Sequence, residues 1–187
     1  MKWIKLFEEF SGVSGDLSPM KPQEVQDLFV KECNKKNPDF SFIEFLLDDK
    51  LVDINVGSKR GITALHSASH RNNAELVELL LSYGARLEIR DDGEWTALHW
   101  ASAEDSLEVA EYLIEMGADI EAESEDGTPL HCASNGNALE VAKLLIDSGA
   151  DVNAKDRIGG SPLDYVKSAD MFELLTLNGA EEGEIEE

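Results

Sequence analysis

The sequence predicts an all-α fold in which pairs of helices stack into a solenoid, with a hairpin tip between successive pairs. One observation is a four-residue motif that recurs at intervals of 33, 32 and 33 residues, beginning at Thr63, Thr96, Thr128 and Ser161. A second is a Gly-Ala pair that recurs at one phase of the same period, at residues 84, 117 and 149. A period of this length is typical of proteins whose repeats each bury an apolar face against their neighbours.

Each period is expected to contain a short helix, a turn, a second helix and an extended tip. The first helix begins after the recurring Thr, because a Thr hydroxyl at the N-cap can accept a hydrogen bond from a free N–H of the first turn. In one copy Pro129 follows the cap, at the first helical position, where a missing N–H costs nothing. This helix ends in segments that tolerate a left-handed cap, such as residues 72–73 and 135–137.

The second helix is predicted by apolar runs such as Leu-Val-Glu-Leu-Leu-Leu at residues 76–81. Its apolar face is broad, as expected for a helix that neighbouring repeats cover on both sides. The recurring Gly84, Gly117 and Gly149 end it in the left-handed conformation.

Residues 1–52 diverge from this period but still indicate helices. A helix from about Pro22 to Lys36, followed by one around residues 42–47, predicts a helical N-terminal capping repeat over residues 18–52. Residues 1–17 are expected to hold an amphipathic helix, from Trp3 to Phe10, and a connector. This helix either packs on the cap or docks a partner, and packing is favoured because apolar stripes usually face a core. About four repeats then fill residues 53–180, and residues 181–187 are expected to be an acidic, unstructured tail.

The recurring motif resembles the ankyrin repeat, a family with a period of about 33 residues and the signature T-P-L-H-x-A. The resemblance rests on Thr-Ala-Leu-His-Ser-Ala at residues 63–68, on the matching residues 96–101 and 128–133, and on Gly-Ala-Asp-Val-Asn-Ala at 149–154. It covers roughly residues 39–180 and implies an ankyrin-repeat solenoid. Two departures stand out. Glu94 occupies the place of the family's tip glycine, and Asp164 replaces the His of the last copy, as a terminal cap would allow.

The resemblance also implies a structural role for His66, His99 and His131, in which each imidazole bonds the backbone at the base of the adjoining tip. Equivalent positions in stacked repeats lie on the order of 10 Å apart, which is the spacing of packed helices. Zinc needs ligand nitrogens about 2.0–2.1 Å from one ion. We therefore expect no metal at these histidines.

Composition and motifs limit the remaining functions. The sequence shows no nucleophile, metal or phosphate-binding motif, so we expect neither an enzyme nor a cofactor. A formal net charge of −23 argues against nucleic acid and anionic membranes. Cys33 and Cys132 lie in no ligand-like spacing, the N-terminus has no signal-peptide pattern, and no apolar run is long enough for a membrane span. We expect a monomer in the cytoplasm, with the nucleus as the alternative.

What remains is protein recognition, which the resemblance places on the hairpin tips and the inner face of the first helices. Trp95 is the sharpest candidate, either as an exposed anchor or folded over its own tip. Residues 86–128 carry 14 Asp and Glu against two Arg, whereas the first tip carries Lys59 and Arg60. We therefore expect a partner protein with a basic segment. The alternative is that the acidic surface faces only water. The alternative function is a scaffold or assembly subunit that uses the N-terminal helix. The partner-binding candidates are Lys59, Arg60, Ile62, His70 and Arg71 in copy one, Asp92, Trp95, Ala103 and Glu104 in copy two, Ser124, Glu125 and Asn135 in copy three, and Arg157 and Ile158 in copy four.

Overall fold

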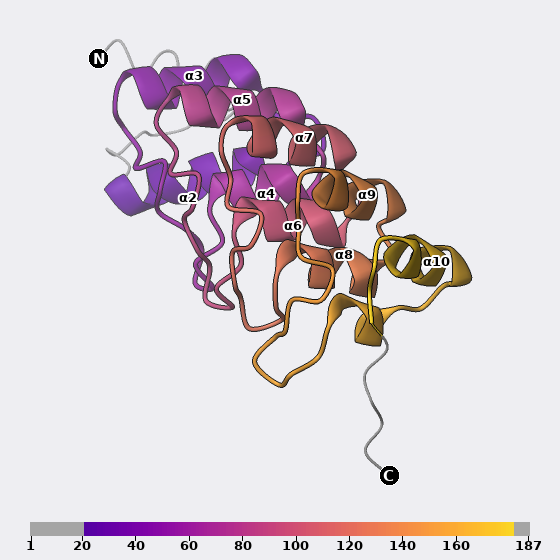
Figure 1. The fold of residues 1–187 in the computed structure, drawn as a ribbon. Coiled ribbons are helices and arrows are strands. Elements are labelled where there is room, and N and C mark those ends of the chain that lie inside the picture. The colour runs from indigo at the N-terminus through magenta and orange to yellow at the C-terminus, as the bar shows by residue number, and fades with distance from the viewer. Residues whose placement is uncertain (1–20, 182–187) are drawn as a thin grey trace. The chain divides into compact units, whose positions relative to one another are not determined.

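The computed structural model describes residues 21–181, and its regular elements there are helices (Figure 1). Apart from an isolated bridge between Ser124 and Gly127, no β-structure occurs in this part of the chain, which confirms the predicted all-α class. None of the helices in these residues is long and apolar enough to cross a membrane. The chain divides into two compact units, Met1–Asp53 and Ile54–Glu187. The helix expected from Trp3 to Phe10, and all but the first residue of the acidic tail, lie outside the described residues.

The first unit contains α2 (Pro22–Cys33) and α3 (Phe40–Asp48), which contact each other. The helix predicted to reach Lys36 ends three residues earlier, with Asn34 at its C-cap. The buried Glu32 joins the two helices, because its carboxylate accepts a hydrogen bond at 2.9 Å from the N–H of Asp39, the N-cap of α3. Whether residues 18–52 cap the repeats stays a prediction.

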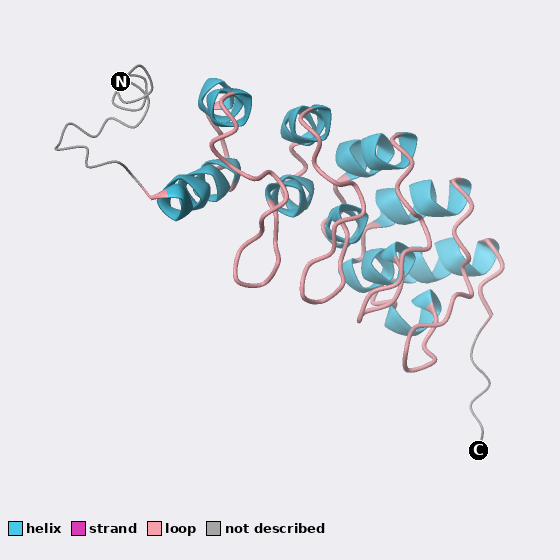
Figure 2. Ribbon diagram, turned by 90° about the vertical axis from the view of Figure 1, so that its left-hand side faces the viewer, coloured by secondary structure: helices cyan, strands magenta, loops and turns pink. Residues whose placement is uncertain are grey.

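The second unit repeats one pair of helices along the chain. The first helices lie side by side in one layer and the second helices in another, with the tips projecting to one side (Figures 1 and 2). The last copy begins with a short 3-10 helix in place of an α-helix. The elements are α4 (Ala64–His70), α5 (Ala74–Ser82), α6 (Ala97–Ala103), α7 (Leu107–Glu115), α8 (Pro129–Gly136), α9 (Leu139–Asp147), η1 (Pro162–Tyr165) and α10 (Ala169–Leu177).

The core of this unit takes the same positions from each copy. A leucine of the recurring motif and a leucine of the second helix are completely or almost completely buried wherever the period is intact. Burial of one such side chain stabilises the fold by about 2 kcal/mol. These leucines are Leu65 and Leu80 in copy one, Leu98 and Leu113 in copy two, and Leu130 and Leu145 in copy three.

Each repeat also caps a helix of the next one. Asn72 and Asp105, which follow the first helices, adopt the left-handed conformation with φ of 52° and 53°. Their side-chain oxygens accept hydrogen bonds from the N–H of Val109 in α7, at 3.2 Å, and of Val141 in α9, at 3.1 Å. These N–H groups belong to the first turn of a helix, where no partner exists within the helix. Stacking therefore completes helices that a single repeat leaves uncapped.

The fourth copy keeps the helix cap with an aspartate in place of the histidine. The carboxylate of Asp164 accepts hydrogen bonds from both the N–H and the hydroxyl of Ser161, at 2.6 and 2.9 Å. These bonds lower the pKa of Asp164. Asp164 therefore stabilises its own turn.

Candidate functional site

The recurring histidine holds the base of tips two, three and four, which are numbered below. In the first three copies the capping Thr donates its backbone N–H to Nδ1 of the His three residues later, at 3.1 Å (Thr63 to His66, Thr96 to His99, Thr128 to His131). The other ring nitrogen, Nε2, lies 3.0 to 3.2 Å from a carbonyl oxygen of the following tip, at Ile89, Gly127 and Gly160 respectively. Because Nδ1 accepts, the proton is on Nε2, which donates to the carbonyl. The expected structural role of these histidines is confirmed.

Burial favours the neutral form of the imidazoles of His66 and His99. Desolvation lowers the pKa of His66, and it lowers the pKa of His99 from 6.5 to about 4. A proton on Nδ1 of His99 would also displace the N–H of Thr96 that this nitrogen accepts. Both ring nitrogens of His66, His99 and His131 therefore bond to backbone groups, and we call these three side chains the histidine braces. Residues 21–181 contain no group of three or more His, Cys, Asp or Glu that could hold a metal ion.

The tips, which we number one to four, are residues 54–62, 87–95, 120–127 and 152–160. Tip two is built around Asp91, whose Oδ1 accepts from the N–H of Gly93 and of Trp95 at 2.9 and 3.0 Å. Its Oδ2 accepts from Nε1 of Trp100 at 3.0 Å. Glu94 turns the chain with φ of 61°, in the left-handed region where the family has glycine. Asp91 therefore holds a turn whose sequence lacks the usual glycine.

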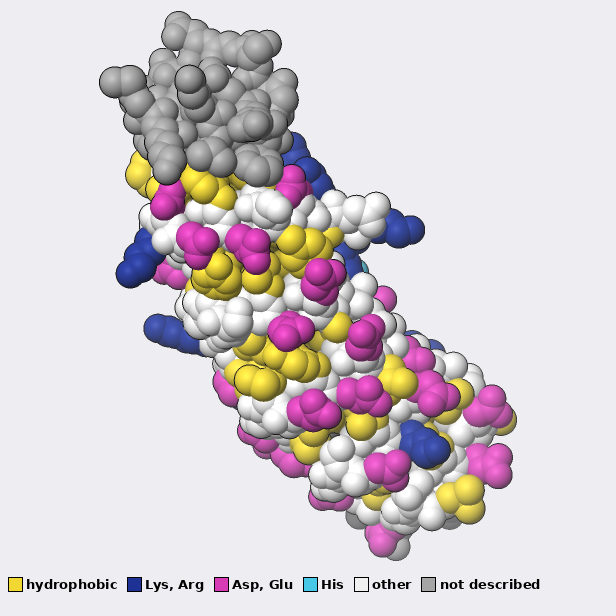
Figure 3. All heavy atoms as spheres, turned by 90° about the horizontal axis from the view of Figure 1, so that it is seen from above, with side chains coloured by type: hydrophobic (Ala, Val, Ile, Leu, Met, Phe, Trp, Pro, Cys, Tyr) yellow, Lys and Arg dark blue, Asp and Glu magenta, His cyan; other side chains and the backbone are white. Residues whose placement is uncertain are grey.

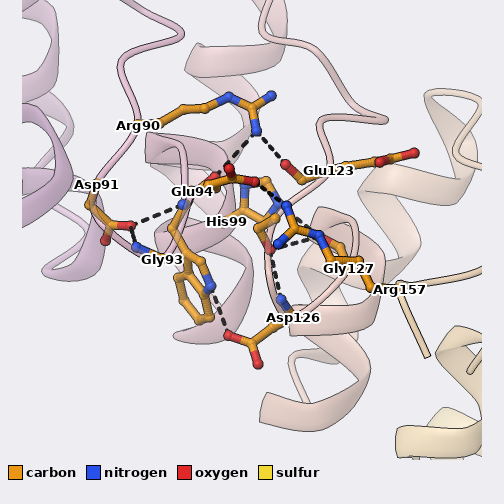
Figure 4. Close-up of polar contacts among 11 residues, drawn as sticks. Arg90, Asp91, Gly93, Glu94, His99, Glu123, Asp126, Gly127 and Arg157 are labelled. Carbon is orange, nitrogen blue, oxygen red and sulfur yellow. Dashed lines mark hydrogen bonds and ion pairs between the residues drawn. The ribbon is translucent and has the colours of Figure 1, made fainter.

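Two arginines join different tips (Figure 4). Arg90 in tip two donates to the carbonyl oxygen of Glu123 in tip three. Arg157 in tip four forms an ion pair with Glu94 in tip two, 63 residues away in the sequence. Tips two, three and four are thus connected by side chains as well as by the histidine braces.

Trp95 is half-buried and lies across the neighbouring tip. Its Nε1 donates to Oδ2 of Asp126 in tip three at 2.9 Å. Its ring centre lies 5.0 Å from that of Trp100 and 6.0 Å from that of His99. The sequence left two alternatives for Trp95, an exposed anchor or a side chain folded over its own tip. The side chain packs on the tips, and part of it remains accessible to solvent.

A cavity of about 410 Å³ opens beside Trp95, and side chains of copies two, three and four line it. It brings together six of the predicted partner-binding residues: Trp95, Ala103, Glu104, Glu125, Asn135 and Ile158. The sequence interpretation missed six further lining residues, which are Asp126, His131, Cys132, Gly136, Asp156 and Tyr165.

The remaining candidates lie elsewhere on the tips and helix ends. His70 is exposed, contacts Glu104 with Nδ1 3.4 Å from Oε1, and packs edge-on against Trp100. Arg157 is paired with Glu94 as described. Outside the cavity, exposed side chains occur at Lys59, Arg60, Arg71 and Asp92, and Ile62 is half-buried.

Ser124 departs from the expectation of an exposed contact residue. Its side chain is 1% exposed. The hydroxyl donates to the carbonyl oxygen of Gly127 at 2.8 Å and accepts from the N–H of Asp126 at 3.2 Å. Tip three is one residue shorter than the others, and Ser124 closes it from the inside, so this side chain is not presented to a partner.

The acidic charge is spread over more than one face. Figure 3 looks onto the side of α5, α7 and α9 and shows Asp and Glu side chains dispersed among apolar ones. Exposed carboxylates on these three helices include Glu78, Glu111 and Glu140. Negative charge alone therefore does not identify a binding site. The cavity beside Trp95 is distinguished by its concave shape and its aromatic side chains.

The geometry offers no nucleophile beside a base among the histidine braces. Both nitrogens of His66 are engaged, and the neighbouring Ser69 donates its hydroxyl to the carbonyl oxygen of Leu65 at 2.9 Å. The two cysteines, Cys33 and Cys132, are free and buried. Burial raises the pKa of both thiols, so neither is an activated nucleophile at neutral pH.

A solenoid of stacked helix pairs with protruding hairpin tips is the class of protein that these features define. Family models place three copies of the ankyrin repeat at residues 31–124 and a further ankyrin repeat at residues 126–157. The chain belongs to the ankyrin-repeat family. A comparison with curated proteins gave no match. Ankyrin repeats are generally protein–protein interaction modules and are typically non-catalytic.

Proposed function

We propose that this protein is a non-catalytic module that binds a partner protein through its hairpin tips and the inner face of its first helices. The observation that carries this proposal is the cavity at which three repeats contribute Trp95, Asn135 and Ile158. Ile158 is 87% exposed, although isoleucine is among the residues most often buried. A concave surface that combines apolar and aromatic side chains with a few polar groups is typical of a binding site.

The rigid construction of the tips supports this function. Backbone groups of tips two, three and four are held by an imidazole of the preceding copy, as in the 3.1 Å bond from His99 to Gly127. The ion pair between Glu94 and Arg157 adds a connection between tips two and four. A surface that is ordered before binding avoids the entropy loss of ordering loops on association.

The charge pattern suggests the polarity of the partner. Lys59 and Arg60 are exposed in tip one, and residues 86–128 carry a net charge of −12 from 14 acidic residues and two Arg. Complementary charges accelerate association and suppress wrong partners. We therefore propose that the partner presents a basic segment to copies two and three. We also propose that the protein acts as a monomer in the cytoplasm, or alternatively in the nucleus.

Partner capture with matched variants tests the proposal. The wild type, Arg60→Ala, Trp95→Ala and Ile158→Ala are used as baits, and Glu111→Ala on α7 serves as a control that changes an exposed carboxylate of a second helix. A protein retained by the wild type is then purified and its affinity measured by calorimetry. Inner-face substitutions should weaken binding about ten-fold or more, as for aromatic anchors. The control should bind as the wild type does, with unchanged helical circular dichroism in all variants.

Two outcomes contradict the proposal. If the inner-face variants bind as tightly as the wild type, the tips and inner face are not the interface. If deletion of residues 1–17 alone abolishes binding, the protein instead uses its N-terminal segment, as an assembly subunit would.

A further inference from the structure

The cavity beside Trp95 has two aromatic walls that carboxylates hold in place. Nε1 of Trp95 donates to Asp126 at 2.9 Å, and the hydroxyl of Tyr165 donates to Asp156. Oδ1 of Asp156 accepts from the N–H of Ile158 and of Gly160, at 2.9 and 2.8 Å. The rings are therefore positioned by hydrogen bonds in addition to packing. Both remain half-exposed at the cavity surface.

A glycine in the cavity lining allows two helices to lie close together. A Cβ at Gly136 would lie 2.3 Å from the carbonyl oxygen of Ala103, at the point where the ends of α6 and α8 approach. Both residues line the cavity. Its volume of about 410 Å³ lies within the range of sites that hold small ligands or single side chains.

The charge of the lining is of one sign. Four carboxylates line the cavity, from Glu104, Glu125, Asp126 and Asp156, and no Lys or Arg occurs among the lining residues that the structure describes. Within residues 21–181, none of the four forms an ion pair with Lys or Arg. Asp126 uses Oδ2 to hold Trp95 and forms no hydrogen bond through Oδ1 within the same residues. The cavity thus combines uncompensated negative charge with aromatic faces.

The chain itself supplies one guanidinium to this region. Arg157, which precedes the exposed Ile158 in tip four, crosses to Glu94 beside Trp95 and pairs with it (Figure 4). The acidic surface around tips two to four is therefore one on which an arginine head group already finds a carboxylate. Glu125 and Asp126, in tip three, are left for a second such group.

We propose that this cavity receives an arginine side chain from the basic segment of a partner protein, with the guanidinium between the ring of Trp95 and the carboxylates of Glu125 and Asp126. This proposal rests on the proposed function and specifies the chemistry of its central contact. A guanidinium is planar, stacks on aromatic faces and donates two parallel hydrogen bonds to carboxylates. An ammonium group offers only a compact charge, and phosphate groups are repelled by the four carboxylates.

The test measures binding of single side chains at the indole of Trp95. The ¹⁵N-labelled full chain is titrated at constant ionic strength with Nα-acetyl-arginine methylamide, with the lysine analogue, and with the uncharged citrulline analogue. The Trp95→Phe variant assigns the indole N–H signal among the three tryptophans of the chain. Arginine should give a saturable shift with a dissociation constant of about 10 mM, and lysine should bind about five-fold more weakly. Citrulline should give no saturable shift.

Substitutions in the lining separate charge from structure. Asp126→Asn keeps an oxygen that can accept from Trp95 and removes the charge, and Glu125→Gln removes the other charge. Each should weaken arginine binding about five-fold or more, whereas Glu111→Gln on α7 should leave it within about two-fold. Circular dichroism and the unchanged resonances of Trp100 verify the fold of each variant.

A shift that stays linear up to about 100 mM arginine overturns the proposal, as do equal shifts with citrulline or full binding by the double variant Glu125→Gln, Asp126→Asn. The proposed function is judged separately by the affinity of the partner for Trp95→Ala. Loss of the partner there, combined with no arginine-specific shift here, would refute the arginine site and leave the inner face as the interface.

Discussion

Replacing His99 with Ala should lower the free energy of unfolding by about 4 kcal/mol, because one brace between two repeats is lost. The ring is completely buried, and it makes two hydrogen bonds of 3.1 Å, to the N–H of Thr96 and the carbonyl oxygen of Gly127. Each lost bond accounts for about 1 kcal/mol, and a backbone group left buried without a partner adds at least as much again. The cavity left by the ring accounts for the remainder.

Urea unfolding followed by far-UV circular dichroism measures this difference. His70→Ala is the matched control, because His70 is exposed and contacts Glu104 at 3.4 Å, an arrangement that contributes less than about 1 kcal/mol. A His99→Ala protein that unfolds within about 1 kcal/mol of the wild type would refute the bracing role, since neither buried backbone group would then have depended on the ring.

Three further predictions concern the same region. As pH falls from 7 to 5, the wild type should lose about 2 kcal/mol more of its free energy of unfolding than His99→Ala does, as measured by urea titrations. The pKa of His99 is about 4 in the folded state and 6.5 in the unfolded state, so in this pH range mainly the unfolded state binds the proton. Equal losses in the two proteins would contradict the lowered pKa. Glu94→Gly should be about 1 kcal/mol more stable than Glu94→Ala in thermal unfolding. Both variants lack the ion pair with Arg157, and only the Ala variant keeps a Cβ at a residue with φ of 61°. The reverse order of stability would contradict the strained turn. Gly136→Ala should cost about 2 kcal/mol in urea unfolding, because its Cβ would overlap the carbonyl oxygen of Ala103, and an unchanged midpoint would show that α6 and α8 can separate freely.

The parts of the fold that repeat could be predicted from the sequence. Caps such as Thr96 are determined locally, because Thr96 and the His99 that it bonds lie three residues apart. The bond from His99 to the following tip joins residues 28 apart and was expected from the resemblance to the ankyrin repeat. The left-handed turn at Asn72 was also predicted, from the tolerance of Asn for that conformation. Its bond to Val109 was not, because that bond joins residues 37 apart and depends on how closely two repeats stack.

The candidate site was only partly predictable for the same reason. The position of Trp95 follows from the motif, whereas its bond to Asp126 and its half-buried state depend on the tip of the next copy. Tyr165 and Asp156 complete the cavity from a copy whose first helix has shortened to η1, which the sequence did not indicate. A Ser or Asp five residues before the cap, as at Ser58, Asp91 and Asp156, is a signal that could have identified the residues that organise the tips.

The burial of Ser124 shows where mapping from a family fails. The mapping placed this residue on a tip, as an exposed contact. Tip three is one residue shorter, so the hydroxyl turns inward to Gly127. A deletion of a single residue thus changes which side chains a tip presents.

Site-specific photocrosslinking tests the central claim, that a partner protein covers the inner face and tips, most directly. A benzoylphenylalanine is placed in cells at Ile158, which is 87% exposed in tip four, or at Met116, which is 51% exposed at the end of α7. We expect one crosslinked protein at position 158 that is lost when Trp95→Ala is added, and no such product at position 116. A partner that crosslinks at position 116, and not at 158, would contradict this claim.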